Sequence, residues 1–185
     1  ALPICLNERT TPSVVYISPQ GDVSVGRAAK GKLDTDPKSV IVEVKRIMGE
    51  QLPGGAKKMA SAAGRELEPE VVSAHILRAL KLAAESFLGG EPIHDAVITV
   101  PAYFKEPQKK ATEEAARIAG LNVRMLVNEP TAAAIAYAAE AEDIQTFLVY
   151  DFGGGTFDVS VVRMDTLHSG EVVGTGGDSH LGGGD

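Results

Sequence analysis

The chain has 185 residues, 44% of them hydrophobic and 23% charged, which is the balance of a globular protein that buries a core. Its net charge of -7 disfavours the phosphate neutralisation that nucleic-acid binding requires. Cys5 is the single cysteine and no Cys/His cluster has zinc spacing, which excludes an internal disulfide framework and a structural zinc site. We therefore expect a protein of the reducing cytosol, without a nucleic-acid partner.

Membrane insertion and export are not expected either. No apolar run approaches the roughly 20 residues of a transmembrane helix, and no basic-then-apolar leader opens the sequence. The chain starts with strand character and stops in a glycine cluster, neither of which is a usual domain boundary. We therefore expect a piece of a larger protein, with one domain or two small lobes in this length.

The opening of the chain predicts short strands and little helix. Residues 4–6 and 13–17 are apolar runs of strand length, and a turn is expected at 19–22. A helical turn is expected at 28–32. A helix is then predicted over 36–49, because Asp36-Pro37 is a typical helix start and apolar residues recur at helical spacing. These apolar residues are Val40, Val44 and Ile47.

The middle of the chain predicts strand–helix–strand alternation. Residues 51–64 show no clear period and predict a loop. A long amphipathic helix follows over 68–88, closed by Gly89 and Gly90. A buried-type strand at 96–100, a helix at 107–119 and a strand at 123–127 then predict parallel pairing with a crossover helix.

The last third predicts one helix and three strands. The helix over 130–141 is rich in alanine, which favours close packing against neighbouring backbone. Strands at 146–152 and 156–164 are joined by three glycines and predict an antiparallel hairpin in the same sheet as the preceding strands. A third strand is expected at 171–175.

The joining segment, DFGGGTFD at 151–158, carries the most specific chemistry in the sequence. Three glycines without Cβ atoms allow backbone amides to approach an anion closely. Asp151 could hold water on a divalent cation, and Thr156 could donate its hydroxyl to a terminal phosphate oxygen. A plain flexible turn is the alternative. Neither the P-loop nor the G-x-G-x-x-G nucleotide fingerprint occurs in the chain.

This segment resembles the second phosphate motif of Hsp70 chaperones, within the superfamily of actins, sugar kinases and Hsp70 proteins. Further blocks resemble Hsp70 motifs in the family's order. They are RTTPS at 9–13, VKRIMG at 44–49, VPAYF at 100–104, NEPTAAAIAY at 128–137 and GDSHLGG at 177–183. The resemblance implies an α/β, actin-like ATPase (ribonuclease H-like) fold, a mixed sheet with crossover helices. Residues 1–145 would form part of the first lobe, and 146–185 the opening strands of the second lobe with the phosphate-binding hairpin.

The resemblance also implies roles for single residues. Lys45 would stabilise charge on the transferred phosphate, although a lysine near a helix end also has a plain electrostatic explanation. Glu129 and Asp151 would organise Mg²⁺ through water, and Thr156 is a further catalytic candidate. Asp158 is a weaker candidate for proton handling. The nucleotide-binding residues implied are Gly153, Gly154, Gly155, Thr156 and Gly183.

Two further positions, Pro101 and Lys109, would couple the nucleotide state to a substrate-binding domain. Pro101 could equally be a simple strand terminator. Lys109 stands where the family commonly has arginine, so it offers a point charge in place of a planar fork.

The function implied is ATP hydrolysis coupled to binding and release of unfolded polypeptides, with ATP/ADP and Mg²⁺ as cofactors. The implied partners are a J-domain co-chaperone and a nucleotide exchange factor. The family's first phosphate loop has no counterpart in the sequence, so we expect this chain alone to be inactive. An actin/sugar-kinase superfamily phosphotransferase and a nucleotide-binding scaffold without turnover are the alternatives.

Overall fold

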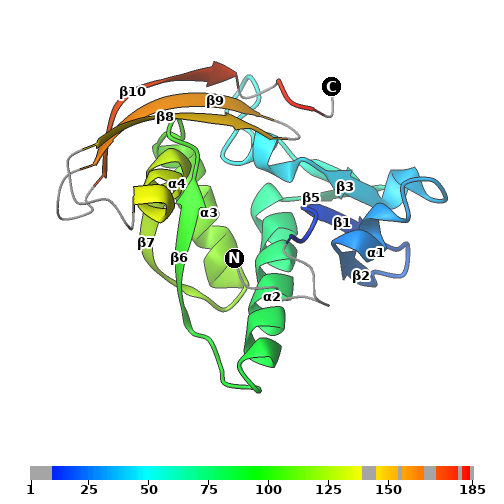
Figure 1. Ribbon diagram of the computed structural model, residues 1–185. Helices are drawn as coiled ribbons and strands as arrows, with labels where there is room; N and C mark the ends of the chain where they lie inside the picture. Colours follow the sequence, from blue (N-terminus) through cyan, green and yellow to red (C-terminus); the bar gives the residue numbers. More distant parts are fainter. Residues whose placement is uncertain (1–9, 139–144, 154–155, 165–169, 179–180, 184–185) are drawn as a thin grey trace. The chain divides into compact units, whose positions relative to one another are not determined.

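The computed structural model shows a mixed α/β protein with several small sheets (Figure 1). It describes residues 10–138, 145–153, 156–164, 170–178 and 181–183. The expected strand at 4–6 lies outside these residues. The chain divides into two compact units, a first unit of residues 1–96 with 106–124 and a second unit of 97–105 with 125–185. None of the helices that the structure describes combines the length and apolarity needed to cross a membrane.

The first unit contains a three-stranded antiparallel sheet of β1 (Val14–Ile17), β2 (Val23–Val25) and β3 (Val40–Val42), in the order β2-β1-β3. The short helix α1 (Arg27–Lys30) contacts β1 and β2. The strand and helical turn expected near 13–17 and 28–32 are therefore confirmed.

The predicted helix over 36–49 is wrong. Two short 3-10 helices, Pro37–Ser39 and Val44–Ile47, flank strand β3 instead. Three consecutive β-branched residues form β3 and pair with β1, which suits their restricted side chains better than a helix does. Glu43 then adopts a left-handed conformation with φ of 54°, where a right-handed helix cannot continue.

The loop expected at 51–64 contains part of a hairpin. Strand β4 (Ala60–Ala62) pairs antiparallel with β5 (Arg65–Leu67). The alanines at 60 and 62 are buried, whereas Ser61 between them is exposed. Such small residues give a weak alternation signal, which explains why the strand is not evident from hydrophobicity alone.

One apolar cluster joins the sheet, the hairpin and a long helix of the first unit. Its members come from β1, β3, β4, the 3-10 helix at Val44–Ile47 and helix α2 (Pro69–Phe87). The buried residues are Val15, Ile17, Ile41, Val44, Ala60, Ala62 and Val72. The same core therefore fixes the segment that carries Lys45.

Helix α2 confirms the predicted amphipathic helix. Pro69 occupies its first turn, where the missing N–H leaves no intrahelical bond unmade. At the other end, the Gly90 N–H donates to the Glu85 carbonyl at 2.8 Å, in a left-handed glycine cap. Helix α3 (Glu106–Ile118) packs along α2 in the same unit, as predicted for 107–119.

At Gly49 the backbone of the chain lies close to the backbone at the start of α3. The φ of Gly49 is 65°, and a Cβ placed there would lie 2.7 Å from the backbone of both Pro107 and Gln108 at the start of α3. The neighbouring Met48 is buried against Ala111 and Ala115 of α3. A residue without a side chain therefore allows the Lys45 segment to reach α3.

Strands β6 (Asp95–Val100) and β7 (Asn122–Asn128) form a two-stranded sheet, with α3 in the connection between them. Both strands match the predicted positions. The expectation that 96–100 is a fully buried strand is wrong, because exposed and part-buried residues alternate along β6 and Val97 is 62% exposed. Only Val100, at its end, is buried.

The second unit contains helix α4 (Glu129–Ala138) packed on an antiparallel sheet of β8 (Gln145–Phe152), β9 (Phe157–Met164) and β10 (Gly170–Asp178). The strand order is β10-β9-β8, and α4 covers one face (Figure 1). Ala134 of α4 packs there with Val162 and Met164 of β9. The predicted hairpin is confirmed. Within the described residues its sheet is separate from the β6–β7 pair, so the expectation of one common sheet is wrong.

Candidate functional site

The β8–β9 hairpin sets two carboxylates directly opposite each other. The register pairs Asp151 with Asp158 and Phe152 with Phe157. Below the turn, the Gly153 N–H donates to the Thr156 carbonyl at 2.9 Å. Like charges facing each other across a strand pair destabilise the pair. A cation held near this position would relieve that repulsion. Gly154 and Gly155 lie outside the described residues.

Tyr103, in the segment after β6, joins this hairpin through a hydrogen bond with the Thr156 side chain. The pKa of the phenol is raised to about 12, mainly by burial and next by the negative charge of Asp158. The hydrogen bond with Thr156 acts in the opposite direction, while Glu129 and Asp151 add smaller upward shifts of the pKa. Three carboxylates and one hydroxyl therefore surround a single phenol.

Glu129 enters this group from the first turn of α4, where a negative charge is favourable at the helix N-terminus. Its carboxylate is part-buried, Asp151 is exposed and Asp158 is only 4% exposed. The group thus combines one buried carboxylate with two that solvent or a ligand can reach. All of these residues belong to the second unit.

Gly183 lies beside the same hairpin. Its N–H donates to the Gly153 carbonyl at 3.0 Å, which links the GDSHLGG segment to the glycine turn. The N–H groups of Gly153 and Gly183 are therefore both engaged within the protein.

The donor set fits a hydrated magnesium ion and a phosphate. Magnesium prefers oxygen ligands and keeps several of its waters, so carboxylates often hold it through water. Among the described residues, no three His, Cys, Asp or Glu side chains lie close enough to hold a metal directly. Asp151 and Glu129, with the Thr156 hydroxyl, would supply the polar oxygens for such an arrangement.

Pro101 also belongs to the second unit and is fully buried, and its carbonyl accepts the Phe104 N–H at 3.1 Å. Lys45 and Lys109 belong to the first unit. Lys45 is exposed on the 3-10 helix Val44–Ile47, not near the end of a long helix as predicted, and Lys109 is part-buried on α3.

Tyr103 is the site residue that sequence reasoning did not single out. It stands in the VPAYF block, whose resemblance was noted without a role for the tyrosine. The ring centres of Tyr103 and the buried Phe104 lie 5.7 Å apart in an edge-to-face contact. In sequence, a tyrosine beside such a phenylalanine cannot be distinguished from a core residue. Its hydroxyl contact with Thr156 is visible only in the fold.

Comparison with known proteins identifies the family of this chain. The chain matches the family described as Hsp70 protein over residues 6–185. It is 49% identical over 189 residues to the chaperone protein HscA homolog of Laribacter hongkongensis (strain HLHK9), in an alignment that covers 94% of this chain. The chain spans 30% of the length of that relative. The family match covers nearly the whole sequence, and the chain therefore belongs to the Hsp70 family.

Proposed function

We propose that this chain is part of the ATP-binding region of an Hsp70-type chaperone with an actin-like ATPase fold. The protein that contains it would hydrolyse ATP with Mg²⁺ and couple that reaction to the binding and release of unfolded polypeptides. The observation that supports this best is the gathering of Glu129, Asp151, Asp158 and Thr156 around Tyr103, beside a glycine turn.

Bound magnesium would polarise the phosphate oxygens and neutralise charge that develops on them. Asp151 and Glu129 would hold the metal through its waters. The Thr156 hydroxyl would bind a phosphate oxygen, and its hydrogen bond with Tyr103 would orient it. The buried Asp158 is proposed to handle a proton.

Three further assignments rest on the family resemblance. Lys45, which is exposed on the 3-10 helix Val44–Ile47, would stabilise charge in the transition state. Pro101 and Lys109 would pass the nucleotide state to a substrate-binding domain. A J-domain co-chaperone and a nucleotide exchange factor are the proposed partners, and the cytosol the proposed compartment.

Steady-state phosphate release by the full-length protein tests this proposal. We expect ATP turnover that requires Mg²⁺ and falls at least about tenfold in Asp151→Asn, which keeps size but removes the metal-organising charge. Glu171→Gln is the matched control, because Glu171 is an exposed carboxylate on β10 of the same sheet. Equal turnover in Asp151→Asn and wild type would contradict the assignment.

The isolated 185-residue chain gives a second test. We expect it to bind ATP only at millimolar concentrations and to show no turnover, because the family's first phosphate loop is missing and few contacts remain to offset the entropy of association. Turnover of the isolated chain that Lys45→Ala abolishes would show that a complete site is present, contrary to this expectation.

A further inference from the structure

The first unit contains a pocket of about 280 Å³ that the proposed ATPase reaction does not use. Its wall is formed by the first turn of α2, by α3 from Pro107 to Glu114 and by the chain before α2. Glu70 comes from α2, Pro107 and Ala111 from α3, and Lys57 and Lys58 from the preceding segment. The pocket thus combines apolar surface with a few charged groups, as small-molecule sites do.

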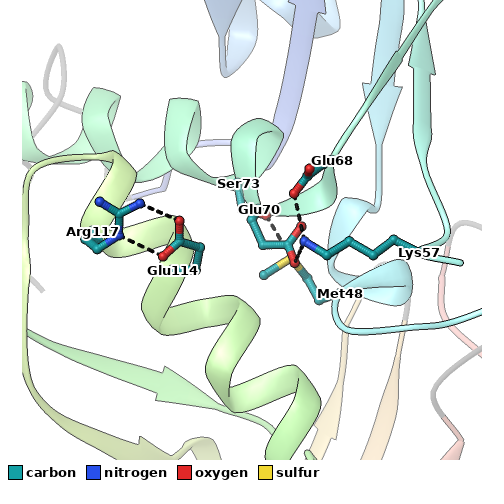
Figure 2. Close-up of polar contacts among 7 residues, drawn as sticks. All are labelled: Met48, Lys57, Glu68, Glu70, Ser73, Glu114 and Arg117. Atoms are coloured by element: carbon teal, nitrogen blue, oxygen red, sulfur yellow. Dashed lines mark hydrogen bonds and ion pairs between the residues drawn. The ribbon is translucent and has the colours of Figure 1, made fainter. Parts of the chain in front are cut away.

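Two of the three lysines of the wall, Lys57 and Lys58, are paired with carboxylates at short distances. The Lys57 ammonium lies 2.7 Å from Glu68 Oε2 and 3.1 Å from Glu70 Oε1 (Figure 2). Lys58 lies 2.8 Å from Glu50 Oε2. The bonds to Glu68 and Glu70 raise the pKa of Lys57, so it remains protonated at neutral pH. These lysines therefore do not make the pocket positive.

The α3 side of the pocket is balanced in the same way. Arg117 binds the Glu114 carboxylate through two hydrogen bonds of 2.8 and 2.6 Å (Figure 2). Lys110, which is well exposed, lies 3.9 Å from Glu106. The charged residues that line the pocket are three carboxylates, Glu50, Glu70 and Glu114, and three lysines, Lys57, Lys58 and Lys110. Their formal charges balance.

Glu70 has a carboxylate oxygen that a ligand could use as an acceptor. The residue is 5% exposed, and its Oε1 is the atom that meets Lys57. Its Oε2 is buried without a hydrogen-bond partner in the described part of the chain. A buried carboxylate oxygen without a donor is costly and rare in native proteins. The terminal torsion of a glutamate is broad, so a modest rotation presents this oxygen to the pocket.

We propose that this pocket binds a small organic cation, a protonated primary amine or a guanidinium, whose N–H groups donate to Glu70. A cation supplies the donor that Glu70 Oε2 lacks. An anion would meet an oxygen that already lacks a donor, and a neutral alcohol would form a weaker bond than a charged donor does. The site is independent of the hairpin chemistry of the second unit.

Calorimetric titration of the full-length protein with 1,4-diaminobutane and with 1,4-butanediol tests the proposal. The two probes have the same length and differ in charge. We expect the diamine to bind at least about tenfold more tightly than the diol, since charged hydrogen bonds are roughly twice as strong as neutral ones. Equal affinities, or no binding of the diamine, would overturn the proposal without any need for a variant.

Two substitutions locate the site. Glu70→Gln removes the charge at constant size and is expected to weaken diamine binding about tenfold, whereas Glu66→Gln, an exposed carboxylate on β5, should leave it unchanged. Lys57→Gln removes the internal cation from Glu70 and is expected to tighten diamine binding. If Glu70→Gln fails to fold, the affinity of Lys57→Gln for the diamine tests the proposal. Unchanged binding in Glu70→Gln, or weaker binding in Lys57→Gln, contradicts the assignment.

Discussion

The first unit builds its main apolar cluster from a sheet, a hairpin and helix α2, whereas the second unit has a smaller apolar cluster and two buried polar side chains on one strand, β9. Val15 and Val72 are fully buried in the first unit. In the second, Asp158 and Ser160 are buried on β9, whereas Leu148 on β8 is 69% exposed. Ser160 is satisfied by Thr175, with 3.0 Å between the two hydroxyl oxygens. Burial of polar groups costs free energy unless they are hydrogen-bonded, so such groups are usually kept for a reason other than stability.

This contrast teaches where substitutions should act. In the first unit we expect them to change mainly the free energy of unfolding. In the second unit we expect changes in ligand binding and turnover with little effect on the fold. Each prediction below tests one side of this division or a place where it should fail.

The largest effect is expected from Gly154→Val in the full-length protein. A β-branched side chain in the glycine turn would block the approach of backbone to phosphate, so ATP affinity should fall roughly 10²-fold or more while the fold survives. Calorimetry with ATP measures this. Gly174→Val is the control, because a Cβ at Gly174 on β10 meets no atom within 4 Å. If Gly154→Val bound ATP like wild type, the hairpin would be a turn and nothing more.

Lys45→Ala should be an exception to the division between the two units. Lys45 belongs to the first unit, but we expect its loss to change turnover and not the free energy of unfolding. Loss of transition-state stabilisation is expected to slow hydrolysis by roughly 10²-fold with ATP affinity nearly unchanged. Single-turnover hydrolysis by the full-length protein separates the two effects. Lys38→Ala, another exposed lysine on a 3-10 helix of the same unit, should be silent. Normal hydrolysis by Lys45→Ala would remove Lys45 from the catalytic residues.

Val72→Ala tests the apolar side of the comparison. Removing two buried carbons should lower the free energy of unfolding by about 2 kcal/mol, a roughly 30-fold change in the equilibrium constant. Leu82→Ala on the same helix removes a larger side chain but one that is 58% exposed, so we expect a change within about 0.5 kcal/mol. Urea denaturation of the purified chain compares them. Similar losses in both variants would mean that the Val72 cluster is not the stabilising core.

The smallest effect is expected at Tyr103. Its pKa is raised from 10.0 to about 12 in the folded chain, so the folded state holds this proton more tightly than the unfolded state does. The stability that depends on the neutral phenol is complete below pH 10 and is lost as the pH rises toward 12. Urea midpoints across this range should fall less steeply in Tyr103→Phe than in wild type. An identical slope in both would place the phenol in an unperturbed environment.

The sequence predicted the strongest local patterns and missed those that tertiary contacts decide. Helix α2 was predictable because an apolar stripe lies between Pro69 and two glycines. The helix prediction for the segment 40–47 was wrong because its apolar spacing also suits a helix. Pairing with β1 makes its first residues a strand, and the left-handed Glu43 interrupts any helix. The three β-branched residues of β3 favour a strand locally, but the helical spacing of Val40, Val44 and Ile47 hides this signal, and no local pattern indicates the left-handed Glu43.

The candidate site divides in the same manner. The hairpin and its carboxylates could be predicted from residues 151–158, because strand ends, glycines and Thr156 are adjacent in sequence. The contact of Tyr103 with Thr156 and the bond from Gly183 to Gly153 join segments far apart along the chain. Such contacts depend on how strands and helices pack, which periodicity does not specify.

The surroundings of Gly49 determine which substitutions this position tolerates. The atoms that would clash with a Cβ there belong to the backbone of Pro107 and Gln108, so no rotamer change elsewhere can make room. Gly54 and Gly55 also have positive φ but meet nothing within 4 Å. In a saturation library selected for folded protein, position 49 should therefore lose all other residues, whereas positions 54 and 55 should retain asparagine and aspartate.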